Sequence, residues 1–297
     1  RGDAVYVSYL DHPVRPEHVS QQWQQHLKPR QSVWKRASLV MGMFVRQLAE
    51  EVQRRWPDKR VVYLPYWDYV LCPDIDFPDN LEIELCITHT DGMPGMAEPW
   101  KRSINDNNIR AWHEKAGGKI TLWNYVHTVR TRGPAQFPFL IQQFHRSHRE
   151  RLAGSFINGV GSIKEWSTLA PSMHVYMKVL WNPDVNVQAI LDELCRRQFG
   201  KASRTTRELL QLMIDRWEKT RWSVKLSQST GLSPDGKIFS ETWPPDVVKR
   251  MTELRNQAWS EMQDDPPALR RFDYWLFSFD AFLIEGKEEG KKAGVVE

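Results

Sequence analysis

Short apolar runs alternate with helical periodicity in the first half of the chain. The residues from Ala4 to Leu10 are rich in β-branched and aromatic side chains, which is typical of a buried strand. Similar runs follow at four more places, each separated from the last by a polar or helical stretch. Together the predicted strands are 4–10, 60–67, 81–89, 119–125 and 154–158.

Apolar residues on one face identify the helices. Val40, Phe44, Leu48 and Val52 recur every fourth residue, and the helix ends before Pro57 because the residue preceding a proline avoids the helical region. Two more helices are predicted in the first half, at about 99–116 and 138–152. The second half carries only helices, at about 173–181, 184–199, 203–217, 247–262 and 269–283.

The order of these elements predicts the fold class. Strands alternating with helices favour an α/β fold with a parallel sheet. Five strands do not close an eight-stranded barrel, so we expect the C-terminal part of a (β/α)8 TIM-type barrel, followed by an all-helical region. The missing N-terminal strands of the same polypeptide would precede Arg1, which is not a methionine. The predicted domains are a partial barrel of catalytic type at 1–165 and a helical region at 166–297; the alternative is an open five-stranded sheet followed by a helical domain.

Composition and charge argue against several classes of partner and structural site. The 297 residues carry a net charge of +4, and the basic residues are scattered rather than clustered, which argues against a nucleic-acid partner. No apolar stretch approaches the roughly 20 residues needed to cross a bilayer. Cys72, Cys86 and Cys195 lie far apart without a CxxC pair, which argues against a disulfide scaffold and a structural zinc site.

Polar and aromatic residues follow every predicted strand. In parallel α/β folds the active site forms at the carboxyl ends of the strands, so these residues are the candidate functional site. The alternative is that these residues are ordinary loop residues, since loops are generally polar. Exposed tryptophan and tyrosine in a loop are unfavourable, however, unless their rings are buried or bind a ligand. The residues after the successive strands are Asp11 and His12; Trp67, Asp68 and Tyr69; His89 and Asp91; Trp123, Asn124, Tyr125, His127 and Arg130; and Asn158.

These residue types suit carbohydrate chemistry. Sugar faces stack on aromatic rings, and cleavage of a glycosidic bond needs two carboxyl groups, for which Asp11, Asp68 and Asp91 are the candidates. Structural roles compete: Asp11 could cap a loop, Asp68 could pair with an arginine, and Asp91 fits a turn before Gly92.

Metal and cofactor chemistry is a weaker alternative. His12, His89 and Asp91 could ligate a transition metal in a metal-dependent hydrolase, and the acidic segment containing Asp74, Asp76 and Asp79 could bind calcium. No glycine-rich phosphate loop and no GxSxG motif is present. We therefore assign neither a cofactor nor a metal.

Several segments resemble the bacterial family called domain of unknown function 4838. The strand that ends in Asp11, the segment 63–66, the strand 81–89 and the ITLWNY strand at 120–125 are similar to successive units of that family. The most specific likeness is the KVLWNPDV segment at 178–185. The resemblance runs from residue 4 to about 220.

The resemblance implies a barrel of the α-glucuronidase type, in large and usually exported bacterial proteins of polysaccharide utilisation. It carries over only Asp11 as a candidate catalytic residue. Family members often have a final-strand glutamate in a Phe-Glu-x-Gly pattern, whereas this chain has Phe156-Ile157-Asn158-Gly159. If that glutamate is the base or nucleophile, this chain is inactive or uses Asp68 or Asp91; Glu165 lies nearby but off the strand end.

The leading hypothesis is a glycoside hydrolase-like protein acting on plant or algal saccharides, with uronic acids among its possible substrates. Asp11 would be the general acid and Asp91 or Asp68 the base. Trp67, Trp123 and Tyr125 would form sugar platforms, while Arg130 and His127 would read hydroxyls or a uronic carboxylate. The alternative is a barrel that binds carbohydrate without cleaving it. The remaining predicted substrate contacts are His12, His89, Asn124 and Asn158.

Overall fold

The computed structural model describes residues 3–7, 21–27, 32–87, 99–118, 120–124, 136–157, 163–219, 243–276, 279, 282–284 and 288. The chain forms two compact units. The first contains residues 1–90, 99–125 and 148–158, and the second contains 91–98, 126–147 and 159–297. Each unit is described by itself.

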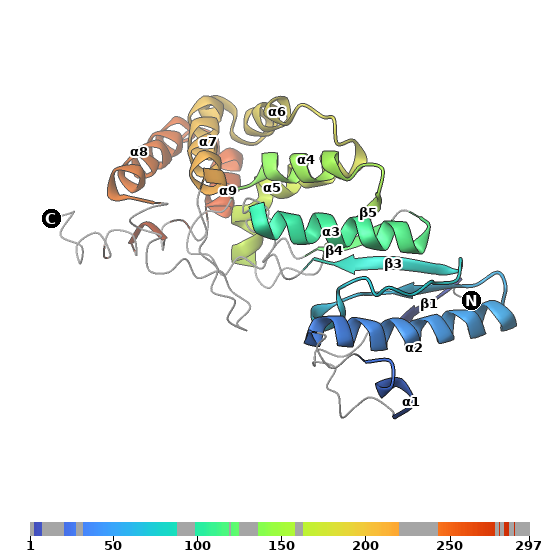
Figure 1. Cartoon of the computed structure of the whole chain (residues 1–297). Helices are drawn as coiled ribbons and strands as arrows, with labels where there is room; N and C mark the ends of the chain where they lie inside the picture. The colour runs from blue at the N-terminus through green and yellow to red at the C-terminus, as the bar shows by residue number, and fades with distance from the viewer. Residues whose placement is uncertain are drawn as a thin grey trace. The chain divides into compact units, whose positions relative to one another are not determined.

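The first unit is built on a parallel sheet. Its five strands lie in sequence order, as Figure 1 shows, and every neighbouring pair is parallel. Parallel pairing in sequence order requires a crossover connection after each strand, and the β2–β3 crossover contains only the short 3-10 turn Trp67–Tyr69 in place of an α-helix. The strands are β1 (Ala4–Val7), β2 (Arg60–Tyr63), β3 (Leu81–Cys86), β4 (Ile120–Asn124) and β5 (Leu152–Ile157).

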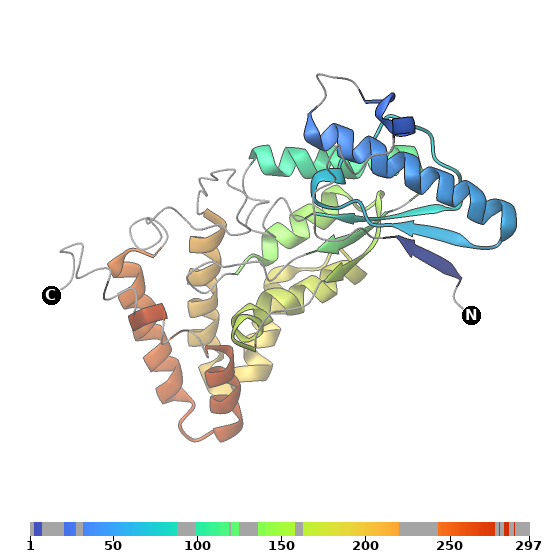
Figure 2. The same ribbon diagram turned by 90° about the horizontal axis from the view of Figure 1, so that it is seen from below.

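Two long helices cover one face of this sheet. Figure 2 shows α2 (Val33–Arg55) and α3 (Pro99–Ala116) on the same side of the strands. Trp112 of α3 packs edge-on against Tyr63 of β2, with ring centroids 5.7 Å apart, and both side chains are buried. This layer buries every second residue of the central strands, which gives the unit its core.

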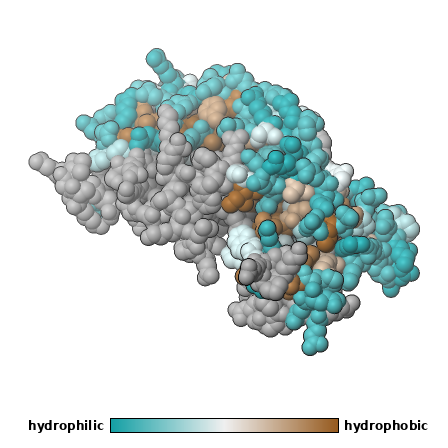
Figure 3. Space-filling model, viewed as in Figure 1, coloured by the Kyte–Doolittle hydropathy of each residue, from teal (hydrophilic) through white to brown (hydrophobic). Residues whose placement is uncertain are grey.

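The second unit is entirely helical in the part that the structure describes. Its helices are α4 (Pro138–Ser147), α5 (Ile163–Trp181), α6 (Val187–Phe199), α7 (Ser203–Lys219), α8 (Pro245–Glu261) and α9 (Pro266–Trp275). Side-chain caps begin two of them: Asn186 accepts from the backbone N–H of Ala189, and Asp265 accepts from that of Ala268. Figure 3 shows hydrophilic side chains over most of the visible described surface, as amphipathic helices require.

The predicted α/β class is confirmed, and the first half does form a parallel sheet. The described strands do not close into a barrel, so the barrel remains a prediction. Residues 126–147, predicted within the partial barrel, group with the helical unit. Among the described residues no helix is long and apolar enough to span a membrane.

Some element boundaries differ from the prediction. Helix α4 ends at Ser147 and β5 already begins at Leu152, whereas the pattern placed the helix up to 152. Helix α5 begins ten residues before the predicted 173 and contains Pro171. Helix α6 begins at Val187, three residues after the predicted 184, because the side chain of Asn186 accepts from the free backbone N–H of Ala189 and so caps the helix there.

Candidate functional site

The face of the sheet opposite α2 and α3 is polar and aromatic. Strand register places its residues side by side, because paired residues of parallel strands point to the same side. Cys86, the register partner of Trp123, is the buried residue of this face at 1% exposure, and the residues named next are half-buried or exposed. We call this the polar face, defined by Tyr6, Arg60, Val62, Glu82, Glu84, Thr121, Trp123 and Phe156.

Two hydrogen-bonded pairs join strands on the polar face, one between the adjacent strands β2 and β3 and one across β2 from β1 to β3. The hydroxyl of Tyr6 on β1 donates to the carboxylate of Glu84 on β3, and the guanidinium of Arg60 on β2 donates to Glu82 on β3. The side chains of Arg60 and Glu82 are 65% and 45% exposed. An exposed ion pair adds little to stability, so the stability of the sheet does not explain these charges.

An aromatic pair lies near Glu84 on the two following strands. Trp123 of β4 and Phe156 of β5 are direct register partners, and their ring centroids are 4.5 Å apart. The Phe156 side chain is 44% exposed. Glu84 is the register partner of Thr121, two residues before Trp123 on the same strand, so a carboxylate and an exposed aromatic surface lie close together.

The carboxyl end of β2 carries an unusual backbone. Trp67 begins a short 3-10 turn (Trp67–Tyr69) with φ of 50°, the left-handed region that a bulky residue enters only at a cost of about 1 to 2 kcal/mol. Rings surround the turn: Tyr66 lies 6.1 Å from Trp67 and 6.3 Å from Tyr69, between centroids. The strained turn therefore fixes an aromatic cluster at the strand end.

Three predicted site residues are buried. Asp68 is 5% exposed and Tyr69 is 0% exposed, and both lie within the turn that follows β2. Asn124 is 0% exposed and alternates with Ile120 and Leu122, so it shares the face of the sheet that the helices cover. Trp67 and Trp123 are both half-buried and lie at the carboxyl ends of their strands, which share one edge of the parallel sheet.

The other predicted residues lie outside the described part of the chain. They stay predictions, because no contact or exposure is known for them. They are Asp11, His12, His89, Asp91, Tyr125, His127, Arg130 and Asn158.

Two residues of the acidic segment after β2 pair with a lysine of α3. Asp74 and Asp76 lie 3.2 Å and 3.5 Å from the ammonium of Lys115 on α3. The hydrogen bond and charge of Asp74 raise the pKa of Lys115. Across the described residues no three His, Cys, Asp or Glu side chains gather as metal ligands would. The segment is thus an exposed ion-pair cluster.

Sequence reasoning missed the polar face. A signal was present: Glu82 and Glu84 alternate with Leu81, Ile83 and Leu85 inside a predicted parallel strand. Buried parallel strands are apolar on both faces, so charged residues at every second position indicate a face that performs another task. The candidate site residues were predicted only from positions at or beyond the strand ends, and the strand interiors were taken to be apolar.

The arrangement combines three chemical capacities. Glu84 and Glu82 supply carboxylates, Arg60 supplies a guanidinium that can pair with an acidic group, and Trp123 with Phe156 supplies a flat apolar surface. Glu84, Trp123 and Phe156 lie close enough to bind one polyhydroxylated ligand that has an apolar ring face, whereas Arg60 and Glu82 lie nearer the amino ends of the strands.

One family model matches the chain. Its description is "Domain of unknown function (DUF4838)", and it covers residues 25–211. This range includes four of the five strands and both helices that cover the sheet. Neither a curated protein nor a solved structure matches the chain.

Proposed function

The chain belongs to the DUF4838 family, and we propose that it is a glycoside hydrolase-like protein that binds plant or algal saccharides and cleaves a glycosidic bond. The observation that carries the proposal is the polar face, where carboxylates and a partly exposed aromatic pair lie on adjacent strands. The proposed substrates include uronic acids, whose carboxylate Arg130 would bind through its guanidinium.

The aromatic pair argues for a sugar rather than a wholly polar ligand. A pyranose ring presents C–H groups on its faces and hydroxyls around its rim. The exposed ring of Phe156 and the half-buried ring of Trp123 would take the ring face, while Glu84 and Thr121 would accept hydroxyl hydrogens. A wholly polar ligand would gain nothing from these rings.

Cleavage requires an acid and a base or nucleophile. We assign the general acid to Asp11 and the base to Asp91, in preference to Asp68, because Asp68 is 5% exposed and a base must reach water or substrate. We assign Glu84 a binding role, in which its carboxylate accepts hydrogen bonds from sugar hydroxyls. The hydrogen bond from the Tyr6 hydroxyl keeps this carboxylate on the polar face.

Turnover by the full chain tests the assignment. Plant and algal oligosaccharides, with and without uronic acids, are incubated with the protein, and new reducing ends are measured. Asp11→Asn and Asp91→Asn should lower the rate by about 100-fold or more. The matched control is Asp74→Asn, because Asp74 is exposed and pairs with Lys115 away from the polar face; its rate should be unchanged. Equal rates in all four proteins would refute the assignment.

A binding protein without chemistry is the second candidate. Strand β5 carries no carboxylate, and the residue that follows it is Asn158. On this alternative the wild-type chain binds an oligosaccharide by calorimetry but releases no reducing ends. Trp123→Ala should then weaken binding by about tenfold or more, as loss of a stacked aromatic ring does. A chain that neither binds nor cleaves any saccharide of the set would contradict both candidates.

A further inference from the structure

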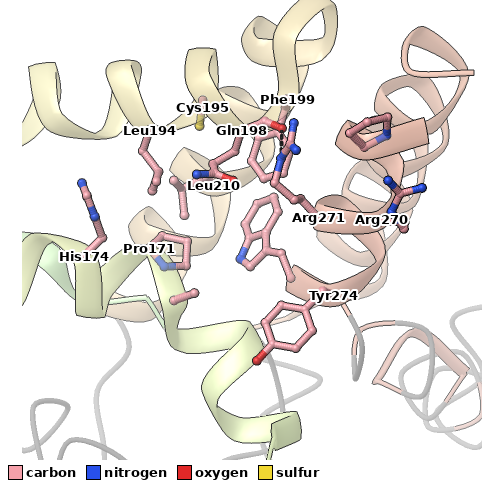
Figure 4. Close-up of a pocket in the computed structure, with 13 residues that line it drawn as sticks. Pro171, His174, Leu194, Cys195, Gln198, Phe199, Leu210, Arg270, Arg271 and Tyr274 are labelled. Atoms are coloured by element: carbon pink, nitrogen blue, oxygen red, sulfur yellow. Dashed lines mark hydrogen bonds between the residues drawn. The ribbon is translucent and has the colours of Figure 1, made fainter. Parts of the chain in front are cut away.

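A cavity of about 500 Å³ lies inside the helical unit, and Figure 4 shows the side chains around it. Four helices supply its walls: Pro171 comes from α5, Leu194 and Phe199 from α6, Leu210 from α7 and Trp275 from α9. A volume of this size is typical of sites for small organic molecules. Neither the family description nor the proposed saccharide site accounts for it.

Aromatic packing fixes the apolar wall. The ring of Phe199 stacks on that of Trp275 with centroids 5.4 Å apart, and Phe272 packs edge-on against both. All three side chains are at most 5% exposed, and Leu210 is 1% exposed. This wall is formed by core packing, so a ligand would meet a rigid apolar surface.

Two arginines give the cavity lining a positive charge. Arg270 and Arg271 follow each other on α9, and none of the described residues that line the cavity is acidic. Arg271 donates from Nε to the backbone carbonyl of Gln198 at 2.8 Å, drawn as the dashed line in Figure 4, which holds this guanidinium beside the end of α6. Among described residues Arg270 has no carboxylate within ion-pair distance, so its charge is open to a ligand.

One buried donor in the wall is left without an acceptor. The indole Nε1–H of Trp275 makes no hydrogen bond within the described part of the chain, although the side chain is 3% exposed. An unpaired buried donor costs about 1 to 3 kcal/mol, and a ligand oxygen would remove that cost. Burial lowers the pKa of His174 at the same cavity, with Lys178 acting in the same direction, so the arginines supply the positive charge near neutral pH.

We propose that this cavity is a binding site for a small aromatic carboxylate. Its ring lies against Phe199, Leu210 and Trp275, and its carboxylate lies at the end of the cavity where Arg270 and Arg271 supply positive charge. A neutral ring compound would leave two guanidinium groups without an anion. A saccharide would place hydroxyls against an aromatic wall that offers them a single donor.

The probe is 2-naphthoate, with the neutral 2-naphthamide as its matched control. Titration calorimetry on the full chain should give a dissociation constant of about 0.1 mM for the acid, and the amide should bind at least about tenfold more weakly. Equal binding of acid and amide, or no binding of the acid at 5 mM or below (about fifty times the expected constant), would overturn the proposal.

Variants locate the site. Arg270→Gln combined with Arg271→Gln should weaken naphthoate binding by about tenfold or more. Arg204→Gln, an exposed arginine of α7 outside the cavity lining, is the control and should leave it unchanged. Ala170→Phe keeps both arginines and fills the mouth of the cavity from an exposed position of α5, so it should also abolish binding. Retention of full affinity in either cavity variant would refute this location.

Discussion

The side-chain carboxyl group of Glu218 on α7 is hydrogen-bonded to the first turn of α4. One carboxylate oxygen accepts hydrogen bonds from the backbone N–H groups of Phe139, at 3.0 Å, and Leu140, at 3.3 Å. Burial raises the pKa of Glu218 to about 7, the charge of Asp215 adds to this, and the two hydrogen bonds oppose it. The carboxyl group is therefore protonated in the folded protein at pH values where an unfolded chain would ionise it.

The sign of the linkage follows from this raised pKa. The folded state holds the proton more tightly than the unfolded state, whose pKa is near 4.5. Its contribution to stability is complete below pH 4.5 and is lost as the pH rises through 7. The pKa of Glu218 differs by about 2.5 between the folded and unfolded states, which corresponds to about 3 kcal/mol of folding free energy. Because the group is partly exposed to solvent, we expect about 2 to 3 kcal/mol.

Glu218→Gln removes the titration and keeps an acceptor oxygen for both backbone N–H groups. At pH 8 the variant should be more stable than the wild type by about 2 kcal/mol, and at pH 5 by less than about 1 kcal/mol. Urea unfolding followed by circular dichroism at pH 5, 6, 7 and 8 gives the free energy of unfolding at each pH, and groups common to both proteins cancel in the difference.

Glu193→Gln is the matched control for this experiment. Glu193 lies on the surface of α6, 48% exposed and paired with Arg197. Its replacement should change stability by less than about 0.5 kcal/mol at every pH. If Glu218→Gln destabilises the protein at pH 8, the two hydrogen bonds outweigh burial and the argument is wrong.

Two further predictions concern the packing around a glycine and a buried hydrogen bond. Gly42→Ala should destabilise the first unit by about 1 to 3 kcal/mol in urea unfolding, because an added Cβ would lie 2.6 Å from Cγ of Pro73. Gly118→Ala meets nothing within 4 Å and should change stability by less than about 0.5 kcal/mol; equal effects would contradict this reasoning. Ser172→Ala should cost about 2 kcal/mol in thermal or urea unfolding, since the buried hydroxyl accepts from the backbone N–H of Phe137 at 3.0 Å. A cost below about 0.5 kcal/mol would show that water replaces the hydroxyl there.

The sequence determined the order and type of most elements. Short apolar runs and apolar residues that recur on one helical face are local properties, so β2, β3 and β4, and the helices around Val40 and Leu191, were predicted near their true positions. The parallel sheet followed from strands that alternate with helices. Exact ends were less certain, because a cap such as Asn186 is chosen by which side chain reaches the free backbone groups.

The candidate site depended much more on tertiary structure. Trp67 and Trp123 were chosen because strand ends meet at one edge, and the sheet places both there. Asn124 was chosen for the same reason, yet strand alternation turns its side chain to the helix-covered face. A residue at a strand end can point to either side, and only the packed helices decide which side is the core.

Contacts between residues far apart in the sequence formed the polar face and the cavity, and no local sequence pattern predicts such contacts. Tyr6 and Glu84 are 78 positions apart in sequence and meet only because β1 and β3 flank β2 in a parallel sheet. The cavity between α5, α6, α7 and α9 likewise joins Pro171 to Trp275, more than 100 residues apart. Hydrophobic burial is non-directional and fixes which faces turn inward, but the partners across an interface are set by how whole elements pack.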